Sequence, residues 1–155
     1  MKSRWKSLIA ALAIPLAAGG IGAWLAGGMD VFETLDKPPL SPPGWLFPVV
    51  WTLLYLMMGL ASRRVYLSCF TASERRAALK LYAAQLVVNM FWPVMFFRWG
   101  LYWAAAVWLG VLIVLVALTL SRFRRMDDLA GLLLWPYLIW CCFALYLNLG
   151  VAILN

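Results

Sequence analysis

Five segments of about twenty apolar residues constrain this chain more than any other feature of its sequence. A helix rises about 1.5 Å per residue, so a segment of this length crosses the roughly 30 Å hydrocarbon core of a bilayer. Alternating segments of about ten residues, which would indicate a membrane barrel, do not recur. The sequence therefore predicts an all-α integral membrane bundle of five transmembrane helices in a single domain, residues 1–155. We expect the helices over residues 5–26, 45–66, 73–97, 101–122 and 128–154.

The composition agrees with a membrane protein and argues against several kinds of chemistry. Hydrophobic residues make up 66% of the chain and charged residues 12%, against about 45–50% and 25% in soluble domains. There is no histidine, and the three cysteines follow neither a disulfide nor a zinc spacing. No acidic or basic residue lies deep in a predicted span, so an ion pump, a proton relay or a hydrolytic triad has no residues to use. We predict no catalytic or metal-binding residue.

The basic residues gather in short segments between the apolar spans. Of the 13 lysines and arginines, three lie at the N-terminus, five where the second and third spans are joined, and three where the fourth and fifth are joined. Only Lys37 and Arg98 fall on the other side. The positive-inside rule then predicts a multi-pass protein of the bacterial inner membrane with a cytoplasmic N-terminus and an external C-terminus. Basic residues in these places contact anionic lipid, and we expect no nucleic-acid partner despite the net charge of +7.

The first connection, residues 27–43, is long for a helix bundle. It contains Pro38, Pro39, Pro42 and Pro43, which fix their own φ and push each preceding residue toward extended geometry. The segment 37–43 should therefore be stiff and non-helical. Long ordered loops often carry function, and we predict that the four prolines form a lid over the mouth of whatever the helices enclose.

Aromatic and polar residues recur at helical spacing in two of the spans. Trp51 and Tyr55 lie four residues apart, and Gln85, Asn89 and Trp92 follow one face of the third span. Uncharged polar side chains at membrane depth need partners, so this face should point to protein or to a cavity. Contact between helices and the lining of a pocket are both compatible with the pattern.

Two further helical patterns leave the same alternatives open. Small residues of the first span, from Gly19 to Ala26, form one face that suits either close packing or space for a ligand. In the last span Pro136, Trp140, Ala144 and Asn148 recur every four residues. A lining built from such residues suits a flat, largely apolar ligand held by stacking and one or two hydrogen bonds.

Three segments of the chain resemble the signature motifs of the TspO/MBR family, whose members are also called translocator proteins, tryptophan-rich sensory proteins or peripheral benzodiazepine receptors. The segments are PPLSPPGWLFPVVWTLLY, AAQLVVNMFWPVMFF and LLWPYLIWCCFALYLN. The ten tryptophans of the chain suit one of these names. The resemblance implies a five-helix bundle, commonly a homodimer, with a pocket open toward the first connection. It implies as ligands porphyrins such as protoporphyrin IX, haem-related tetrapyrroles and drug-like molecules.

The resemblance also assigns ligand-binding residues by position. They are Trp51, Tyr55, Asn89, Trp92, Pro136, Trp140 and Ala144. Animal members end their last helix in a sterol-associated motif that contains an arginine, whereas LNLGVAILN here has no basic residue. This departure argues against sterol recognition of that type.

Three functions are compatible with these observations. The leading one is a receptor-like membrane protein that binds porphyrin or haem as its ligand, needs no cofactor, and senses or regulates tetrapyrrole levels. A transporter of tetrapyrroles or other amphiphiles is the first alternative. The second is an enzyme of light-dependent porphyrin breakdown, in which Trp51 and Trp140 would supply radical chemistry.

Overall fold

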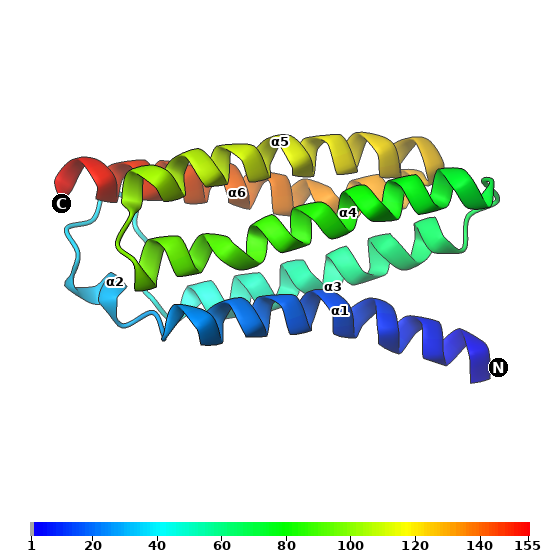
Figure 1. Ribbon diagram of the computed structural model, residues 1–155, viewed down its shortest axis with the longest axis horizontal. Coiled ribbons are helices and arrows are strands. Elements are labelled where there is room, and N and C mark those ends of the chain that lie inside the picture. The colour runs from blue at the N-terminus through cyan, green and yellow to red at the C-terminus, as the bar shows by residue number, and fades with distance from the viewer. Residues whose placement is uncertain (1) are drawn as a thin grey trace.

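The computed structural model describes residues 2–155 and forms one elongated bundle of long helices (Figure 1). Five helices are long and apolar enough to cross a membrane, which confirms the predicted fold class. They are α1 (Lys2–Ala26), α3 (Leu46–Tyr66), α4 (Ala72–Pro93), α5 (Tyr102–Met126) and α6 (Asp128–Leu154). Two short elements accompany them, α2 (Val31–Thr34) in the first connection and the π-helical turn η1 (Val94–Arg98) after α4.

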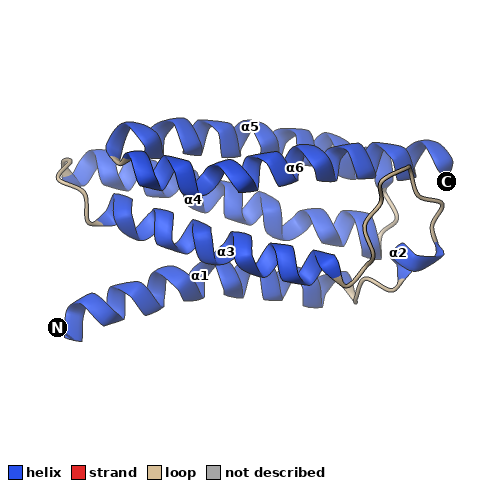
Figure 2. Cartoon of the chain, turned by 180° about the vertical axis from the view of Figure 1, so that it is seen from behind, coloured by secondary structure: helices blue, strands red, loops and turns tan. Residues whose placement is uncertain are grey.

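Helix α1 lies at the edge of the bundle. It packs on α3, α4 and η1, whereas α5 and α6 pack along each other on the opposite side (Figure 1). Only 11% of the most apolar window of α1 is buried inside the protein, against 33–39% in the other four long helices. Pro15 lies inside α1, and the N-terminal half of the helix diverges from the bundle in Figure 2. Helix α1 therefore has the weakest protein contacts of the five.

The small residues of α1 permit close packing at some positions and border an open space at others. A Cβ at Gly22 would lie 2.7 Å from the carbonyl oxygen of Met90 in α4, so only glycine permits this approach of the two helices. A Cβ at Gly19 would overlap the ring of Tyr55. Gly20 and Ala23 instead border an open space between α1 and α3. Close packing and space for a ligand alternate along one helix.

The connection between the last two long helices is shorter than predicted. Helix α5 was expected to end at residue 122 in a basic turn, and this is wrong: it continues to Met126, with Arg124 and Arg125 in its last turn. Arginine is a good helix former, and cations near a helix C-terminus interact favourably with the helix dipole. Asp127 alone separates α5 from α6, and its side chain caps α6 by accepting from the amide of Ala130 at 2.7 Å.

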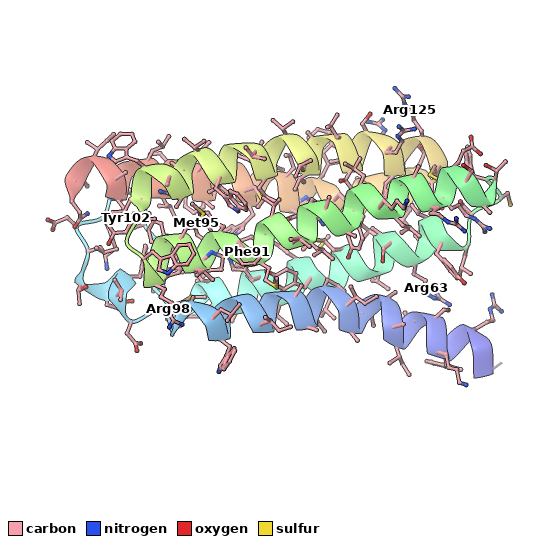
Figure 3. All side chains as sticks on the ribbon, in the orientation of Figure 1. Arg63, Phe91, Met95, Arg98, Tyr102 and Arg125 are labelled. Carbon is pink, nitrogen blue, oxygen red and sulfur yellow. The ribbon has the colours of Figure 1, made fainter. Side chains whose placement is uncertain are left out.

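The two ends of α4 follow from local sequence. Thr71 and Glu74 form the predicted capping box at its start. At its end, the helical segment continues to Arg98, close to the predicted end at residue 97, but its last turn after Pro93 has wider π-helical geometry. Proline has no amide hydrogen, and its ring crowds the carbonyl one turn earlier. Arg98 then donates to the carbonyl oxygen of Leu25 at 2.9 Å, which ties η1 to the end of α1 (Figure 3).

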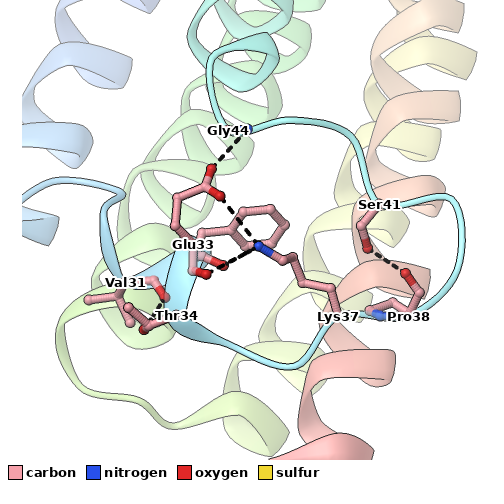
Figure 4. Close-up of polar contacts among 8 residues, drawn as sticks. Val31, Glu33, Thr34, Lys37, Pro38, Ser41 and Gly44 are labelled. Carbon is pink, nitrogen blue, oxygen red and sulfur yellow. Dashed lines mark hydrogen bonds and ion pairs between the residues drawn. The ribbon is translucent and has the colours of Figure 1, made fainter.

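The first connection is ordered by its own polar contacts. The Glu33 carboxylate accepts from the amide of Gly44 at 3.2 Å, and the Lys37 ammonium donates to the carbonyl oxygen of Phe32 at 3.0 Å (Figure 4). Residues 36–43 contain no helix, as their prolines predict. The short helix α2 was not predicted. The Phe32 ring of α2 packs edge-on against the Phe47 ring of α3, with ring centroids 5.0 Å apart. This contact anchors the first connection to the bundle.

Candidate functional site

A cavity of about 260 Å³ lies between α1, α3 and α4, in the half of the bundle next to the first connection. Its lining is mostly apolar and aromatic, and the described lining contains no charged side chain. The lining residues are Leu16, Gly19, Gly20 and Ala23 of α1, Met29 of the first connection, Phe47, Pro48, Trp51, Thr52 and Tyr55 of α3, Asn89, Trp92 and Pro93 of α4, and Phe97 of η1. Gly20, Ala23, Pro48 and Thr52 are exposed, so the cavity opens sideways between α1 and α3.

Two stacked aromatic rings form the α3 wall of this cavity. The rings of Trp51 and Tyr55 have centroids 5.6 Å apart and an interplanar angle of 27°. Tyr137 of α6 meets the Trp51 ring edge-on at 6.2 Å from the side away from the cavity lining. Trp51 is half-buried, which leaves part of its surface open to a ligand. Such a wall favours a flat ring placed parallel to it or edge-on against it.

A chain of buried hydrogen bonds crosses the bundle behind this wall. Tyr55 Oη donates to Asn89 Oδ1 at 2.8 Å, and Asn89 Nδ2 donates to Tyr137 Oη at 2.7 Å. Tyr137 Oη in turn donates to Gln85 Oε1 at 2.6 Å. The predicted polar stripe of α4 therefore holds α3, α4 and α6 together and also borders the cavity. Its polar atoms satisfy one another, which leaves the cavity itself largely apolar.

Trp92 is held in place from α6. Its Nε1 donates to Asn148 Oδ1 at 3.0 Å, and Asn148 Nδ2 donates to the carbonyl oxygen of Tyr102 at 2.8 Å. The Trp92 ring also stacks on Phe96, with centroids 5.5 Å apart. These contacts orient the indole so that part of it borders the cavity.

The comparison with known proteins agrees with this architecture, since residues 11–154 match the TspO/MBR family. This chain belongs to the TspO/MBR family. Together with the five apolar helices, this makes it a multi-pass membrane protein.

Relatives of the TspO/MBR chain occur in bacteria and animals. It is 40% identical to the tryptophan-rich protein TspO of Chlorobaculum tepidum over 124 residues, 80% of this chain and 78% of the relative. It is 36% identical to the tryptophan-rich sensory protein of Cereibacter sphaeroides over 155 residues, 100% of this chain and 95% of the relative. It is 34% identical to the translocator protein of Ovis aries over 152 residues, 96% of this chain and 89% of the relative.

The cavity of this TspO/MBR protein gathers four of the seven residues that the sequence assigned to ligand binding. Trp51, Tyr55, Asn89 and Trp92 all border it, from two neighbouring helices. Helical spacing identified the pair on α3 and the pair on α4 separately. The packing of α3 on α4 brings the two pairs to one cavity, and ligand binding by these residues stays a prediction.

The three assigned residues of α6 lie elsewhere. Ala144 is buried beside a space of about 10 Å³ behind Phe47 and Trp92, and Pro136 is exposed on the surface of α6. Trp140 packs against Phe47 with ring centroids 5.9 Å apart, one layer behind the cavity. No residue of α6 belongs to the described lining, so the part of these three residues in ligand binding stays a prediction.

Several lining residues were not singled out from the sequence. Phe47 precedes Trp51 by four residues and continues the series that Trp51 and Tyr55 begin, so its spacing contained a usable signal. Pro48 and Thr52 form a parallel pair one residue further on. The contributions of Met29 and Phe97 carried no such signal, because one lies in a loop and the other in η1.

The predicted lid lies across the end of the bundle and is attached to α6. Tyr146 Oη donates to the carbonyl oxygen of Pro39 at 2.7 Å, and Asp36 and Asn155 exchange two hydrogen bonds of 3.1 and 2.9 Å. Figure 2 shows the connection running from α1 to the C-terminal end of α6 and back to α3. None of the four prolines belongs to the described lining, to which the connection contributes Met29. Their role as a lid stays a prediction.

Proposed function

We propose that this protein is a receptor-like membrane protein that binds a porphyrin or related tetrapyrrole in the cavity between α1, α3 and α4, and that it senses or regulates tetrapyrrole levels. The observation that carries the proposal is the uncharged aromatic lining, with the parallel rings of Trp51 and Tyr55 on one wall. Flat, largely apolar molecules gain most from such a surface. The relative in Cereibacter sphaeroides is named a sensory protein, which agrees with this function.

The size of the cavity requires that α1 moves when a tetrapyrrole binds. Its volume of about 260 Å³ lies below the roughly 300–1,000 Å³ of typical ligand pockets. Helix α1 buries the smallest share of its surface, and Gly20 and Ala23 leave the cavity open on its side. An outward shift of α1 would widen the slot at small cost in lost contacts. We expect the ligand to enter sideways from the bilayer, between α1 and α3.

Trp140 offers a hydrogen-bond donor that such a widening would expose. Its Nε1 is buried and has no hydrogen-bond partner among the described residues. A buried donor without a partner costs about 1–3 kcal/mol. The Phe47 ring lies between this indole and the cavity. A ligand that displaced Phe47 would bring an acceptor within reach of Trp140, which gives the residue a binding role despite its position.

The test is a titration of the purified protein with protoporphyrin IX in the dark, followed by tryptophan fluorescence. We expect saturable quenching that Asn89→Ala and Trp140→Phe each weaken several-fold. Trp103→Phe is the matched control, because this indole is 60% exposed on α5 and lies outside the cavity. Quenching that does not saturate, or that falls equally in the control, would mean that the porphyrin only partitions into the detergent.

The sideways opening also favours transport as a second function. A slot that faces the bilayer could pass an amphiphile from the lipid to the end of the bundle beneath the first connection. Reconstituted vesicles distinguish the two functions: exchange of porphyrin across the membrane supports transport, whereas stoichiometric binding without flux supports a receptor. The same preparation reports whether the protein is a homodimer, as the family resemblance implies.

The orientation that we propose rests on the basic residues. Most of them lie at the start of α1, in the last turn of α3, in the first turns of α4 and toward the end of α5, and these segments share one end of the bundle (Figure 1). The positive-inside rule puts this end in the cytoplasm of a bacterial inner membrane. Accessibility of a single cysteine introduced at Leu40, which is 85% exposed, would test it from outside intact cells.

A further inference from the structure

A second cavity, of about 390 Å³, lies between the same three helices at the opposite end of the bundle. It shares no lining residue with the first. Its walls are Ser7, Ala10, Ala11 and Ile14 of α1, Ser62, Arg63 and Tyr66 of α3, and Leu79, Tyr82, Ala83 and Leu86 of α4. Aliphatic side chains dominate this lining, and one charged residue, Arg63, also borders it.

The Tyr82 hydroxyl in this cavity makes no hydrogen bond of full geometry, although the Ser62 hydroxyl lies close to it. Tyr82 is 5% exposed, and its Oη has no partner among the described residues. The hydroxyl of Ser62, which also lines the cavity, donates to the carbonyl oxygen of Gly59 at 2.9 Å. Buried hydroxyl groups are nearly always paired, so an unpaired one that borders a cavity indicates a missing acceptor.

The Arg63 guanidinium is the second polar group at this cavity whose hydrogen-bonding capacity is incompletely used. Its guanidinium makes only long contacts, 3.5 Å to Ser7 Oγ and 3.4 Å to the carbonyl oxygen of Arg4. The neighbouring Arg64 instead forms an ion pair with Asp127 at 2.7 Å. Within residues 2–155, no carboxylate lies within ion-pair distance of Arg63. Its position between α1 and α3 is visible in Figure 3.

More positive charge lies beside the cavity. A shallow depression on its α4 side contains Arg75, Arg76 and Lys80 and shares Tyr66, Leu79 and Ala83 with the cavity lining. Positive charge at the edge of an apolar slot is the arrangement that suits an amphiphile with an anionic head. Guanidinium groups bind phosphate with two parallel hydrogen bonds.

We propose that this cavity binds an anionic phospholipid of the surrounding bilayer, independently of any ligand in the first cavity. The headgroup phosphate pairs with Arg63. One acyl chain lies along Ile14, Leu79 and Leu86, and the Tyr82 hydroxyl donates to an ester carbonyl at the head of that chain. The lipid thus supplies an anion to Arg63, an acceptor to Tyr82 and apolar contacts to the walls of the slot.

The test is native mass spectrometry of delipidated protein in a neutral detergent, titrated with phosphatidylglycerol or phosphatidylcholine. The wild type should prefer phosphatidylglycerol. Arg63→Gln should lower phosphatidylglycerol affinity about tenfold and phosphatidylcholine affinity less, because both lipids lose the phosphate pair but the choline ammonium already neutralises that phosphate. Tyr82→Phe should lower the affinity for both lipids about fivefold, since both carry the ester carbonyl.

Two further variants separate this site from general surface charge. Arg125→Gln removes one positive charge at the same end of the bundle from an exposed position on α5, and should leave both affinities unchanged (Figure 3). Ala83→Phe, at an exposed lining position, should fill the slot and abolish binding of both lipids. Circular dichroism checks that each variant is folded.

Four outcomes would overturn the proposal. Equal affinity of the wild type for the two lipids would show that the cavity does not select an anionic headgroup. Equal losses of affinity in Arg125→Gln and Arg63→Gln would show that general surface charge, and not this cavity, binds the lipid. Binding of oleate without binding of phosphatidylglycerol would assign the cavity to a fatty acid. Lipid adducts on monomers but never on dimers would show that a second copy of the chain fills the cavity.

Discussion

The two ends of the bundle use the same three helices to enclose cavities of different character. Next to the first connection, Tyr55, Asn89 and Tyr137 satisfy one another's hydrogen bonds, and the cavity presents aromatic rings. At the opposite end, Tyr82 and Arg63 face a cavity without comparable partners. A cavity whose polar groups are already paired selects by shape and stacking, whereas unpaired groups select a ligand that supplies what they lack. Among the side chains that line the two cavities, the pairing of polar groups, more than volume, distinguishes the two sites.

The largest effect that would sharpen this comparison is expected from Trp51→Ala. The change removes the aromatic surface next to Tyr55, and loss of a large stacked ring costs about 2–3 kcal/mol of binding free energy. Protoporphyrin affinity, followed by absorbance of the porphyrin, should fall roughly 30- to 150-fold. Binding of phosphatidylglycerol to the same variant should not change. Parallel losses of both ligands would show that the two cavities are not independent.

A pair of tyrosine substitutions tests the difference in pairing directly. Tyr55→Phe leaves Asn89 Oδ1 without its donor and should lower the free energy of unfolding by about 1 kcal/mol. Tyr82→Phe removes a hydroxyl that has no partner, and should be neutral or stabilise delipidated protein by up to about 1 kcal/mol. Both variants lose one oxygen atom from a buried ring, so each is the control for the other. Thermal unfolding in detergent measures them, and equal destabilisation would break the comparison.

A smaller effect is expected from the first connection. Pro42→Gly combined with Pro43→Gly makes the predicted lid more flexible, and each such change is worth roughly 0.4–1 kcal/mol. We expect the off-rate of protoporphyrin to rise about fivefold, with a smaller change in protein stability. Tyr146→Phe, which frees Pro39 from α6, should act in the same direction. Unchanged off-rates in a stopped-flow displacement experiment would show that the connection is not a lid.

The smallest effect is expected from the ion pair between Arg64 and Asp127 at the basic end of the bundle. The hydrogen bond from Arg64 holds the pKa of the Asp127 carboxyl below its usual range. Because the folded-state pKa is the lower one, this pairing stabilises the fold above the unfolded-state pKa of about 3.9, and its contribution is lost as the pH falls through the folded-state value. Asp127→Asn should therefore lower the unfolding temperature by about 2 °C or less at pH 7. The difference between wild type and variant should begin to shrink as the pH falls below about 4 and should vanish below the folded-state pKa, and a difference that persists there would contradict the assignment.

The placement of the candidate site could be predicted only in part. Helical spacing grouped Trp51 with Tyr55 and Asn89 with Trp92, and both pairs border one cavity. The same reasoning failed for Pro136, which is exposed, because no residue of α6 reaches the described lining and the packing of the helices decides this. The loop contribution of Met29 depends on the path of a segment without periodicity.

Local chemistry in the sequence determined the five spans, the capping box of Thr71 and Glu74, the non-helical proline segment and the concentration of basic residues at one end. Each depends on residues within a few positions of one another, through hydrophobic length, capping or fixed φ. The tertiary structure decided which faces meet. It decided that α3 and α4 turn their aromatic residues toward α1, that the first connection is attached to α6, and that Tyr82 lacks a partner. These outcomes depend on the rotation of each helix about its axis, which is set by packing against neighbours and not by the helix's own sequence.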